Sequence, residues 1–150
     1  MEPIQLYKTE KKIVIVGLYA TGKTTLTKEI LLLDPSFTLY KTDQYINRTS
    51  VLVSLIRHQR PEKYIVEGAA AYKMLRDGEL KPDVVINCVC SDGERQRRYQ
   101  QPDRIDGNRY KGDRPGMKTG YKAFDNYYRS LWQQYLDSKP TSRIIQYLTE

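Results

Sequence analysis

Cysteine, histidine and long apolar runs are scarce in this chain of 150 residues. Cys88, Cys90 and the single His58 are too few ligands to favour a zinc or redox site. The two cysteines alternate in the apolar run 84–90, so they would face one side of a strand, where a disulfide between them has poor geometry. No apolar run is long enough to span a membrane, and residues 1–5 lack the pattern of a secretory signal. We therefore expect an intracellular, cytoplasmic protein with free, buried thiols.

Internal repeats and low-complexity linkers are also absent, and the length suits a single domain over residues 1–150. The mean hydropathy of −0.67 and the 29% of charged residues are typical of a soluble protein. Strands are predicted at 12–16, 37–40, 63–68, 82–90 and 143–148, and helices at 25–33, 51–57, 69–76, 92–101 and 118–137. This alternation predicts a three-layer α/β fold, in which helices cover both faces of a five-stranded parallel sheet.

Residues 17–24, GLYATGKT, match the phosphate-binding loop (P-loop) pattern G-x-x-x-x-G-K-[ST] without a mismatch. A predicted strand precedes the motif and a predicted helix follows it, which is the required context. In such a loop, backbone N–H groups surround a phosphate and the helix N-terminus adds partial positive charge. Lys23 would reach the β- and γ-phosphates, and the Thr24 hydroxyl would ligate Mg²⁺. The residues predicted to bind ATP are Gly17, Tyr19, Ala20, Thr21, Gly22, Lys23, Thr24 and Thr25.

Two carboxylates follow the next two predicted strands. Asp43 comes after the strand at 37–40, and Glu67 lies near the end of the strand at 63–68. Because the carboxyl ends of parallel strands share one edge of the sheet, both should converge on the P-loop. We predict that Asp43 accepts the proton of an acceptor hydroxyl, the alternative being a turn residue that caps the next segment. Glu67 is predicted to hold Mg²⁺ through water, with the base role as its alternative.

Positive charge is concentrated in one part of the chain. The formal net charge is +7, and the segment 95–122 contains nine basic and three acidic residues. Residues 102–116 are rich in glycine, proline and charge, so we predict a mobile loop and, with the helix before it, a lid over 92–117. Arg98 and Arg104 are predicted to stabilise charge on the transferred phosphate. Lid arginines for ATP explain only some of these cations, so the excess favours DNA or RNA as a partner.

The chain contains 13 tyrosines. Tyr19 in the P-loop and Tyr45 after Asp43 are placed to stack on a base, although ordinary packing explains each of them equally well. The aromatic side chains of the helix at 118–137 are predicted to belong to the core, and His58 is expected to be solvated.

Together these motifs resemble the P-loop kinase superfamily over nearly the whole chain. Gly22, Lys23 and Thr24 match its ATP loop, and the segment 40–45, YKTDQY, is similar to the segment of phage-type polynucleotide kinases that carries the acceptor-hydroxyl base. The resemblance thus implies that Asp43 is the base and that ATP and Mg²⁺ are used. The pair Glu67-Gly68 is more similar to nucleoside kinases. A further resemblance is to phage DNA kinases that phosphorylate a hydroxymethylated pyrimidine, which implies a virus-infected host cell as the setting.

Three functions therefore remain open. The first is an ATP-dependent kinase that acts on a hydroxyl of DNA or RNA, which the local charge favours. The second is a kinase for a free nucleoside or nucleoside monophosphate, which the P-loop, Asp43 and Glu67 fit equally well. The third is a nucleotide-binding switch or nucleic-acid-binding module without phosphotransfer, against which Asp43 and the predicted lid both argue.

Overall fold

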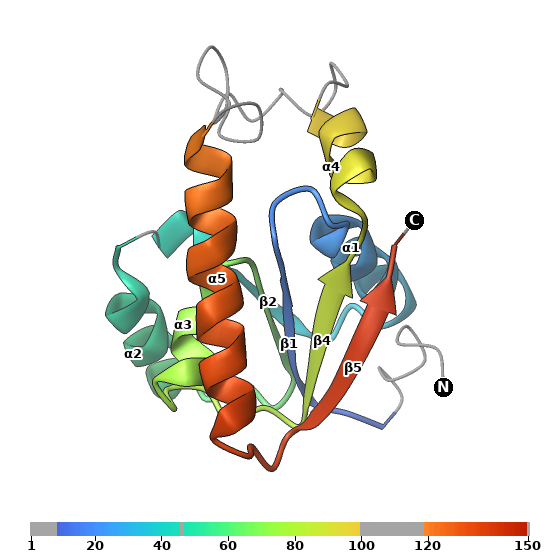
Figure 1. Cartoon of the computed structure of the whole chain (residues 1–150). Coiled ribbons are helices and arrows are strands. Elements are labelled where there is room, and N and C mark those ends of the chain that lie inside the picture. The colour runs from blue at the N-terminus through green and yellow to red at the C-terminus, as the bar shows by residue number, and fades with distance from the viewer. Residues whose placement is uncertain (1–8, 46, 100–118, 150) are drawn as a thin grey trace.

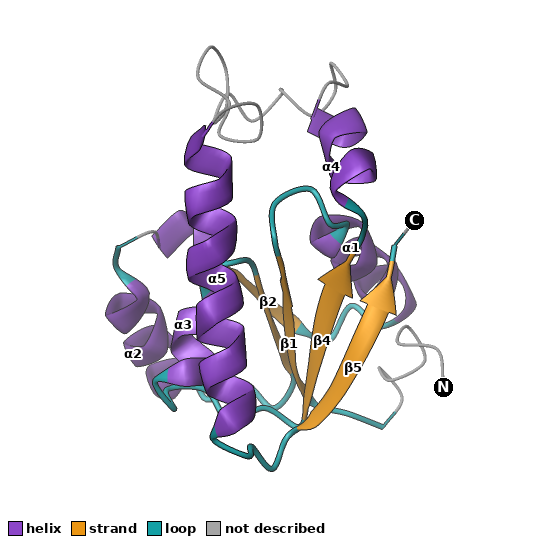
Figure 2. Ribbon diagram, in the orientation of Figure 1, coloured by secondary structure: helices purple, strands orange, loops and turns teal. Residues whose placement is uncertain are grey.

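The computed structural model describes residues 9–45, 47–99 and 119–149, which form a five-stranded sheet flanked by helices (Figures 1 and 2). The elements are β1 (Lys12–Gly17), α1 (Lys23–Leu33), β2 (Thr38–Lys41), a 3₁₀ turn η2 (Thr42–Tyr45), α2 (Thr49–Gln59), β3 (Tyr64–Glu67), α3 (Ala71–Arg76), β4 (Val84–Val89), α4 (Asp92–Tyr99), α5 (Thr119–Asp137) and β5 (Arg143–Leu148). Every expected strand and helix is present, with slightly different boundaries. Of the predicted lid, α4 is described, whereas residues 100–117, and Arg104 with them, lie outside the described residues.

Strand β1 lies at the centre of the sheet, whose order is β2-β3-β1-β4-β5 with every neighbouring pair parallel. Residues 13–16 of β1 are completely buried, which is why this strand is a continuous β-branched run. Strands β2 and β3 lie on one side of β1, and strands β4 and β5 lie on the other side. Open parallel sheets bind ligands where the strand order reverses in this way, and the P-loop follows β1 at that place (Figure 1).

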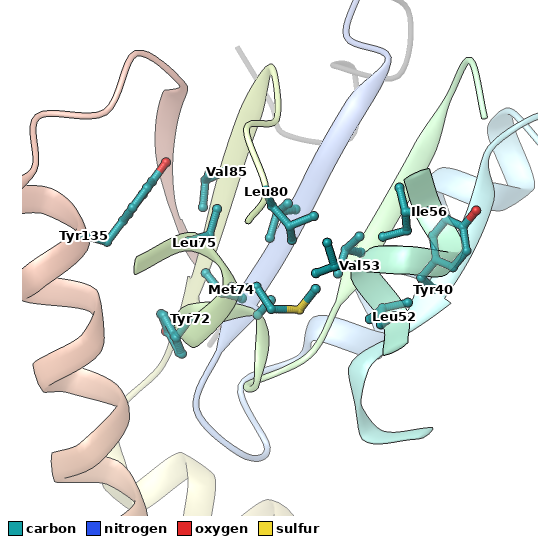
Figure 3. Close-up of a cluster of buried hydrophobic side chains, with 14 of the residues drawn as sticks. Tyr40, Leu52, Val53, Ile56, Tyr72, Met74, Leu75, Leu80, Val85 and Tyr135 are labelled. Carbon is teal, nitrogen blue, oxygen red and sulfur yellow. The ribbon is translucent and has the colours of Figure 1, made fainter. Parts of the chain in front are cut away.

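Apolar side chains form one core on each face of the sheet. On one face α2, α3 and α5 contribute, among others, Leu52, Met74 and Tyr135 (Figure 3). On the opposite face α1 contributes Leu26 and Ile30. The helices thereby hold the strand ends, and the loops that follow them, in fixed positions. Within the described residues, none of the helices is both long and apolar enough to cross a bilayer.

Helix α2 begins at Thr49, with Arg48 at its N-cap and no capping side-chain hydrogen bond. One local expectation is wrong. Strand β4 ends before Cys90, so the two cysteines do not share a strand. Cys88 is buried, and its burial raises the pKa of its thiol to about 12. Cys88 is therefore a neutral packing residue near neutral pH.

Candidate functional site

The P-loop connects the buried strand β1 to α1 through a turn that few side chains would allow. A Cβ at Gly17 would lie 2.4 Å from Thr21 Oγ1 and 2.8 Å from Cys88 O, so this position has no room for a side chain. Ala20 and Gly22 have φ angles of 62° and 92°, which turn the chain before α1 begins. The first N–H groups of α1, which have no partner within the helix, therefore stand beside the turn, as an anion site requires.

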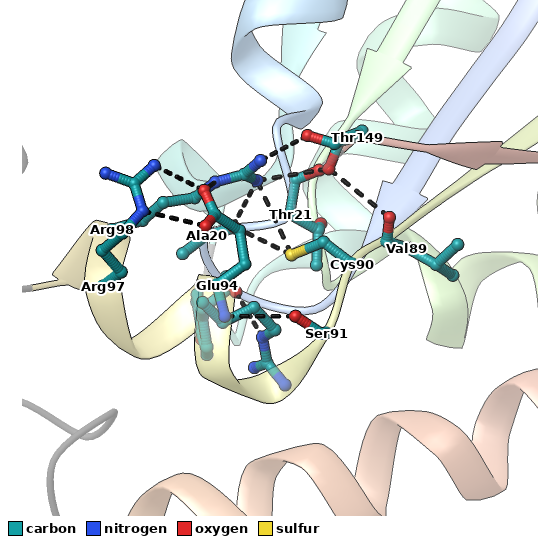
Figure 4. A network of polar contacts seen from close by, with 11 residues as sticks. Ala20, Thr21, Val89, Cys90, Ser91, Glu94, Arg97, Arg98 and Thr149 are labelled. Atoms are coloured by element: carbon teal, nitrogen blue, oxygen red, sulfur yellow. Dashed lines mark hydrogen bonds and ion pairs between the residues drawn. The ribbon is translucent and has the colours of Figure 1, made fainter.

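Four consecutive P-loop carbonyls, those of residues 18–21, accept hydrogen bonds from side chains. Figure 4 shows the contacts at Ala20 and Thr21. The bonds run from Lys23 Nζ to Leu18 O at 2.7 Å, from Arg95 Nε to Tyr19 O at 2.9 Å, from Arg98 Nη1 to Ala20 O at 2.9 Å and from Thr149 Oγ1 to Thr21 O at 2.6 Å. Three of these donors come from α4 and from the end of β5 rather than from the loop itself. These bonds hold the loop through its carbonyl groups. The N–H groups of the loop can therefore bind an anion.

Thr24 and Glu67 meet at the carboxyl edge of the sheet. Thr24 Oγ1 donates a hydrogen bond of 2.8 Å to Glu67 Oε1, and Glu67 is only 5% exposed. A hydroxyl and a carboxylate are hard oxygen ligands, of which Mg²⁺ takes one or two beside phosphate oxygens and water. The two residues therefore fit the Mg²⁺ site that the sequence predicts. No group of three or more His, Cys, Asp and Glu side chains forms a metal cluster within the described ranges.

Asp43 lies on η2, which directly follows β2, and β2 is the neighbour of β3 in the sheet. Lys41 at the end of β2 pairs in register with Glu67 of β3, and η2 follows directly. Gly68 has a φ of 141°, and a Cβ there would lie 1.9 Å from Thr42 Oγ1, so the chain after β3 presses closely on η2. The Asp43 side chain is exposed, whereas Thr42 is buried. The fold therefore brings Asp43, Glu67 and the P-loop to one end of the sheet.

Arg95 joins the P-loop to α5. Its guanidinium donates to both carboxylate oxygens of Asp125 at 2.8 and 2.9 Å, and it also donates to Tyr19 O. The two side chains are 1% and 5% exposed. Bidentate arginine–carboxylate pairs combine charge with fixed geometry. This buried pair therefore fixes α5 relative to the loop that would hold the phosphates.

Arg98, predicted to act on the transferred phosphate, contacts the P-loop from the α4 side (Figure 4). Besides Ala20 O, its guanidinium donates to Thr149 O and to Thr149 Oγ1, and its Nε donates to Glu94 Oε1 at 3.0 Å. Together with Gly22, Thr25 and Thr149, Arg98 lines a cavity of about 330 Å³ beside the start of α1. The observed contacts make Arg98 a support of the loop. Its action on the transferred phosphate stays a prediction, as does that of Arg104.

Tyr19 packs against the aromatic side chains of α5. Its ring centroid lies 6.2 Å from those of Phe124 and Tyr128, in edge-to-face geometry. Tyr19 also borders a cavity of about 150 Å³ whose other lining residues include Asn47, Lys73, Tyr127 and Tyr128. Tyr45, in contrast, is partly buried and packs against the core beneath α2 and α3. Tyr19 therefore stays a candidate for stacking on a base, and Tyr45 has the packing role.

The aromatic helix α5 is only partly core, contrary to expectation. Leu131 and Tyr135 are buried, but Phe124 and Tyr127 are 44% and 49% exposed. The exposed rings lie in α5 before Leu131 and Tyr135 in the sequence, and Phe124 contacts the ring of Tyr19. One end of the helix therefore packs on the sheet, and the other end presents aromatic surface next to the P-loop.

Sequence reasoning missed Asp125, Thr149 and the steric role of Gly68. Arg95 and Arg98 are three residues apart, so a helix places them on one face, but their spacing does not show what they contact. Nothing near Asp125 or Thr149 marks them, because they lie 30 and 51 residues from the arginines they contact. Long-range polar pairs of this kind become visible only when the chain has folded.

No known protein family and no curated protein sequence matches this chain, but solved structures resemble it. Shikimate kinase from Acinetobacter baumannii, in complex with shikimate, superposes with a TM-score of 0.57 at 15% identity, over 99% of this chain and 87% of that one. Thymidylate kinase from Candida albicans superposes with a TM-score of 0.54 at 14% identity, over 94% of this chain and 85% of that one. At such low identity the similarity concerns the fold. The predicted α/β fold of the P-loop kinases is thereby confirmed.

Proposed function

We propose that this protein is an ATP-dependent phosphotransferase that phosphorylates a hydroxyl of a nucleic acid, either a 5′-hydroxyl or a hydroxymethyl group on a pyrimidine of DNA. The observation that carries the phosphotransfer is the Thr24–Glu67 hydrogen bond of 2.8 Å beside the P-loop, with Asp43 on the adjacent strand end. The nucleic-acid acceptor rests on the net charge of +7 and its concentration in residues 95–122. The structural neighbours, a shikimate kinase and a thymidylate kinase, lend no support to a nucleic-acid acceptor.

The donor ATP would place its phosphates in the P-loop. Backbone N–H groups at the start of α1 and the Lys23 ammonium would neutralise the phosphate oxygens. The cavity of about 330 Å³ beside Gly22 and Thr25 offers space for the rest of the donor nucleotide. Mg²⁺, held by Thr24 and Glu67, would supply positive charge to the phosphates when bound.

The acceptor would approach from the side of η2. Asp43 would accept the proton of the acceptor hydroxyl while the oxygen of that hydroxyl bonds to the γ-phosphorus. At the same time the bond between the γ-phosphorus and the β–γ bridging oxygen would break, and ADP would leave. We assign this role to Asp43 rather than to Glu67 because Asp43 is exposed, whereas Glu67 is buried and bonded to Thr24. The aromatic surface of Tyr19 and Tyr127 would stack on the base that carries or adjoins the hydroxyl.

A free nucleoside or nucleoside monophosphate is the second candidate acceptor. The cavity beside Tyr19 is small, at about 150 Å³, and Lys73 at its border would suit a single phosphate. The structural similarity to a thymidylate kinase also supports an acceptor of this size. This candidate shares the donor site and Asp43 with the first.

The deciding experiment is transfer of γ-labelled phosphate from ATP to a panel of acceptors with Mg²⁺ present. The panel contains 5′-hydroxyl DNA, DNA with hydroxymethylpyrimidine, RNA, free nucleosides and nucleoside monophosphates. Label on a polymer, with a rate that falls steeply as salt rises, would support the nucleic-acid acceptor. Label on small molecules alone would establish the second candidate.

The Lys23→Ala variant is the control for this panel. We expect it to lose transfer to every acceptor, because the contact to the β- and γ-phosphates is lost. Near-normal turnover by Lys23→Ala, or no labelled product from the unaltered chain, would contradict the proposed phosphotransfer.

A further inference from the structure

A second large cleft lies at the end of the sheet opposite the P-loop. It has a volume of about 770 Å³ and lies among α2, the turn before β3, the turn after α3 and the start of β1. Lys12 and Tyr64, which begin β1 and β3, are among its lining residues. With six residues in β1, the cleft is about 20 Å from the phosphate site. It therefore belongs to no part of the catalytic arrangement proposed above.

The cleft is strongly basic. Its lining includes four cations, Lys12, Arg57, Arg60 and Lys81, and one carboxylate, Glu79, a net charge of +3. All four cationic residues are exposed, and across the described part of the chain none of their side chains forms an ion pair or a side-chain hydrogen bond. Elsewhere on the surface, Lys11, Lys63 and Arg143 pair with Glu62, Asp34 and Glu10. Four cations without such partners around one concave surface generate a positive potential that attracts a multiply charged anion.

The backbone conformation of Arg60 is a second, independent observation on the cleft. It ends α2 with φ 47° and ψ 53°, the left-handed conformation that glycine or asparagine adopts at lower cost. An arginine at this position weakens the helix end, yet it places a guanidinium at the cleft. A local cost of this kind is explained if the side chain binds a ligand.

The floor of the cleft differs chemically from its rim. Val53, Ile56, Tyr64 and Leu80 line it together with Pro61, and several of them belong to the core beneath α2 and α3 (Figure 3). A Cβ placed on Gly78 would meet no atom within 4 Å, so this edge is open to a ligand. An apolar floor with cations around it suits a molecule that combines a ring system with phosphates. We propose that this cleft binds a nucleotide, with its phosphates on Arg57, Arg60 and Lys81, at a site separate from the P-loop.

The test is a titration of the ¹⁵N-labelled chain followed through backbone amide chemical shifts. Mg²⁺ and ADP, the oligonucleotide dT6 and inorganic pyrophosphate are added in separate series. We expect the amides of residues 57–60 and 78–81 to shift with ADP or with dT6, with a midpoint different from that of the P-loop amides. A response to ADP would identify a free nucleotide as the ligand, and a response to dT6 alone would identify a nucleic-acid strand. Because the two groups of amides are read separately, failure of the cleft and failure of the P-loop site are distinguishable.

Arg60→Gly and Lys139→Gly form a matched pair of variants. Lys139 is an exposed cation that also holds a left-handed conformation after a helix, with φ 53°, but it does not line the cleft. Both substitutions remove one charge and place glycine, which adopts a positive φ angle at lower cost, in the left-handed conformation. Both should therefore leave the melting temperature unchanged or higher. Arg60→Gly, and likewise Arg57→Gln, should weaken binding at the cleft about tenfold, the loss of one charge-assisted hydrogen bond. Lys139→Gly should leave that binding unchanged.

Three results would overturn the proposal. The first is the absence of any shift at residues 57–60 and 78–81 with both ADP and dT6. The second is equal weakening by Arg60→Gly and Lys139→Gly, which would mean that only overall charge matters. The third is binding of pyrophosphate as tight as that of ADP and dT6, which would remove the role of the ring system.

Discussion

Asp43 and Glu67 are carboxylates at neighbouring strand ends with different surroundings. Glu67 is 5% exposed and accepts a hydrogen bond from Thr24, so it is directed at the P-loop. Asp43 is exposed on η2, where an acceptor molecule can reach it. Gly68 keeps these two segments in contact, because any side chain there would collide with Thr42. At the scale of single residues, burial thus separates the proposed metal ligand from the proposed base.

Neutralising each acid should therefore change different kinetic quantities. We expect Asp43→Asn to leave ATP binding intact and to lower kcat about 100-fold or more, because the proton acceptor is lost. Glu67→Gln should instead raise the Mg²⁺ concentration needed for half-maximal activity, by about tenfold. Steady-state rates over a Mg²⁺ titration measure both. An unchanged kcat in Asp43→Asn would move the base role to Glu67.

At the scale of elements, α4 and α5 hold the P-loop between them. Arg95 of α4 binds Tyr19 O and pairs with Asp125 of α5, and Arg98 of α4 binds Ala20 O. In the sequence, α4 is the first part of the predicted lid, and α5 follows the lid. The Arg95–Asp125 pair therefore joins a helix of the predicted lid, and the helix that follows the lid, to the phosphate site.

Breaking this buried pair should destabilise the protein strongly. We expect Arg95→Met to lower the free energy of unfolding by about 3–5 kcal/mol, because Asp125 is left as a buried charge without its partner. Adding Asp125→Leu should restore much of the loss. Arg97→Ala is the control, since Arg97 is 60% exposed and its pair with Glu94 should contribute about 1 kcal/mol or less. Urea unfolding measures all three variants and the unaltered chain, and a small loss in Arg95→Met would contradict the buried-pair interpretation.

Across the whole molecule, two acid–base pairs make stability depend on pH. Hydrogen bonds from Arg97 and Arg98 lower the pKa of Glu94 from 4.5 to about 2. A hydrogen bond from Lys63, with others from Ser36, lowers the pKa of Asp34 from 3.8 to about 2. Because the folded-state pKa is the lower one, each group stabilises the fold fully above its unfolded-state pKa and loses that contribution as the pH falls toward 2.

The urea midpoint should accordingly fall between about pH 5 and pH 2 as these two carboxylates take up protons. Glu94→Gln and Asp34→Asn should each reduce the slope of that fall, because the variant has one fewer carboxylate that must be protonated. Glu62→Gln, at a highly exposed carboxylate, serves as the control. Equal slopes in all three variants and the unaltered chain would contradict the assignment.

The secondary structure could be predicted from short segments of the sequence. The β-branched run before Gly17 and the apolar spacing of α2 can each be recognised within a few residues. The P-loop could also be recognised from the sequence, because phosphate binding requires glycine, lysine and threonine at fixed spacing within one turn. The same logic could not find Asp125 or Thr149, whose partners are distant in sequence.

By itself, the sequence determined the order of strands and helices, the P-loop and the candidacy of Asp43 and Glu67, because each depends on residues close together in the chain. Only the tertiary structure decided that Arg95 and Arg98 bind P-loop carbonyls, that Glu67 is buried against Thr24, and that Tyr45 packs in the core. It also gathered Lys12, Arg57, Arg60 and Lys81 around one cleft. The physical reason is that burial and long-range pairing depend on which elements the sheet brings together, and local composition does not encode that arrangement.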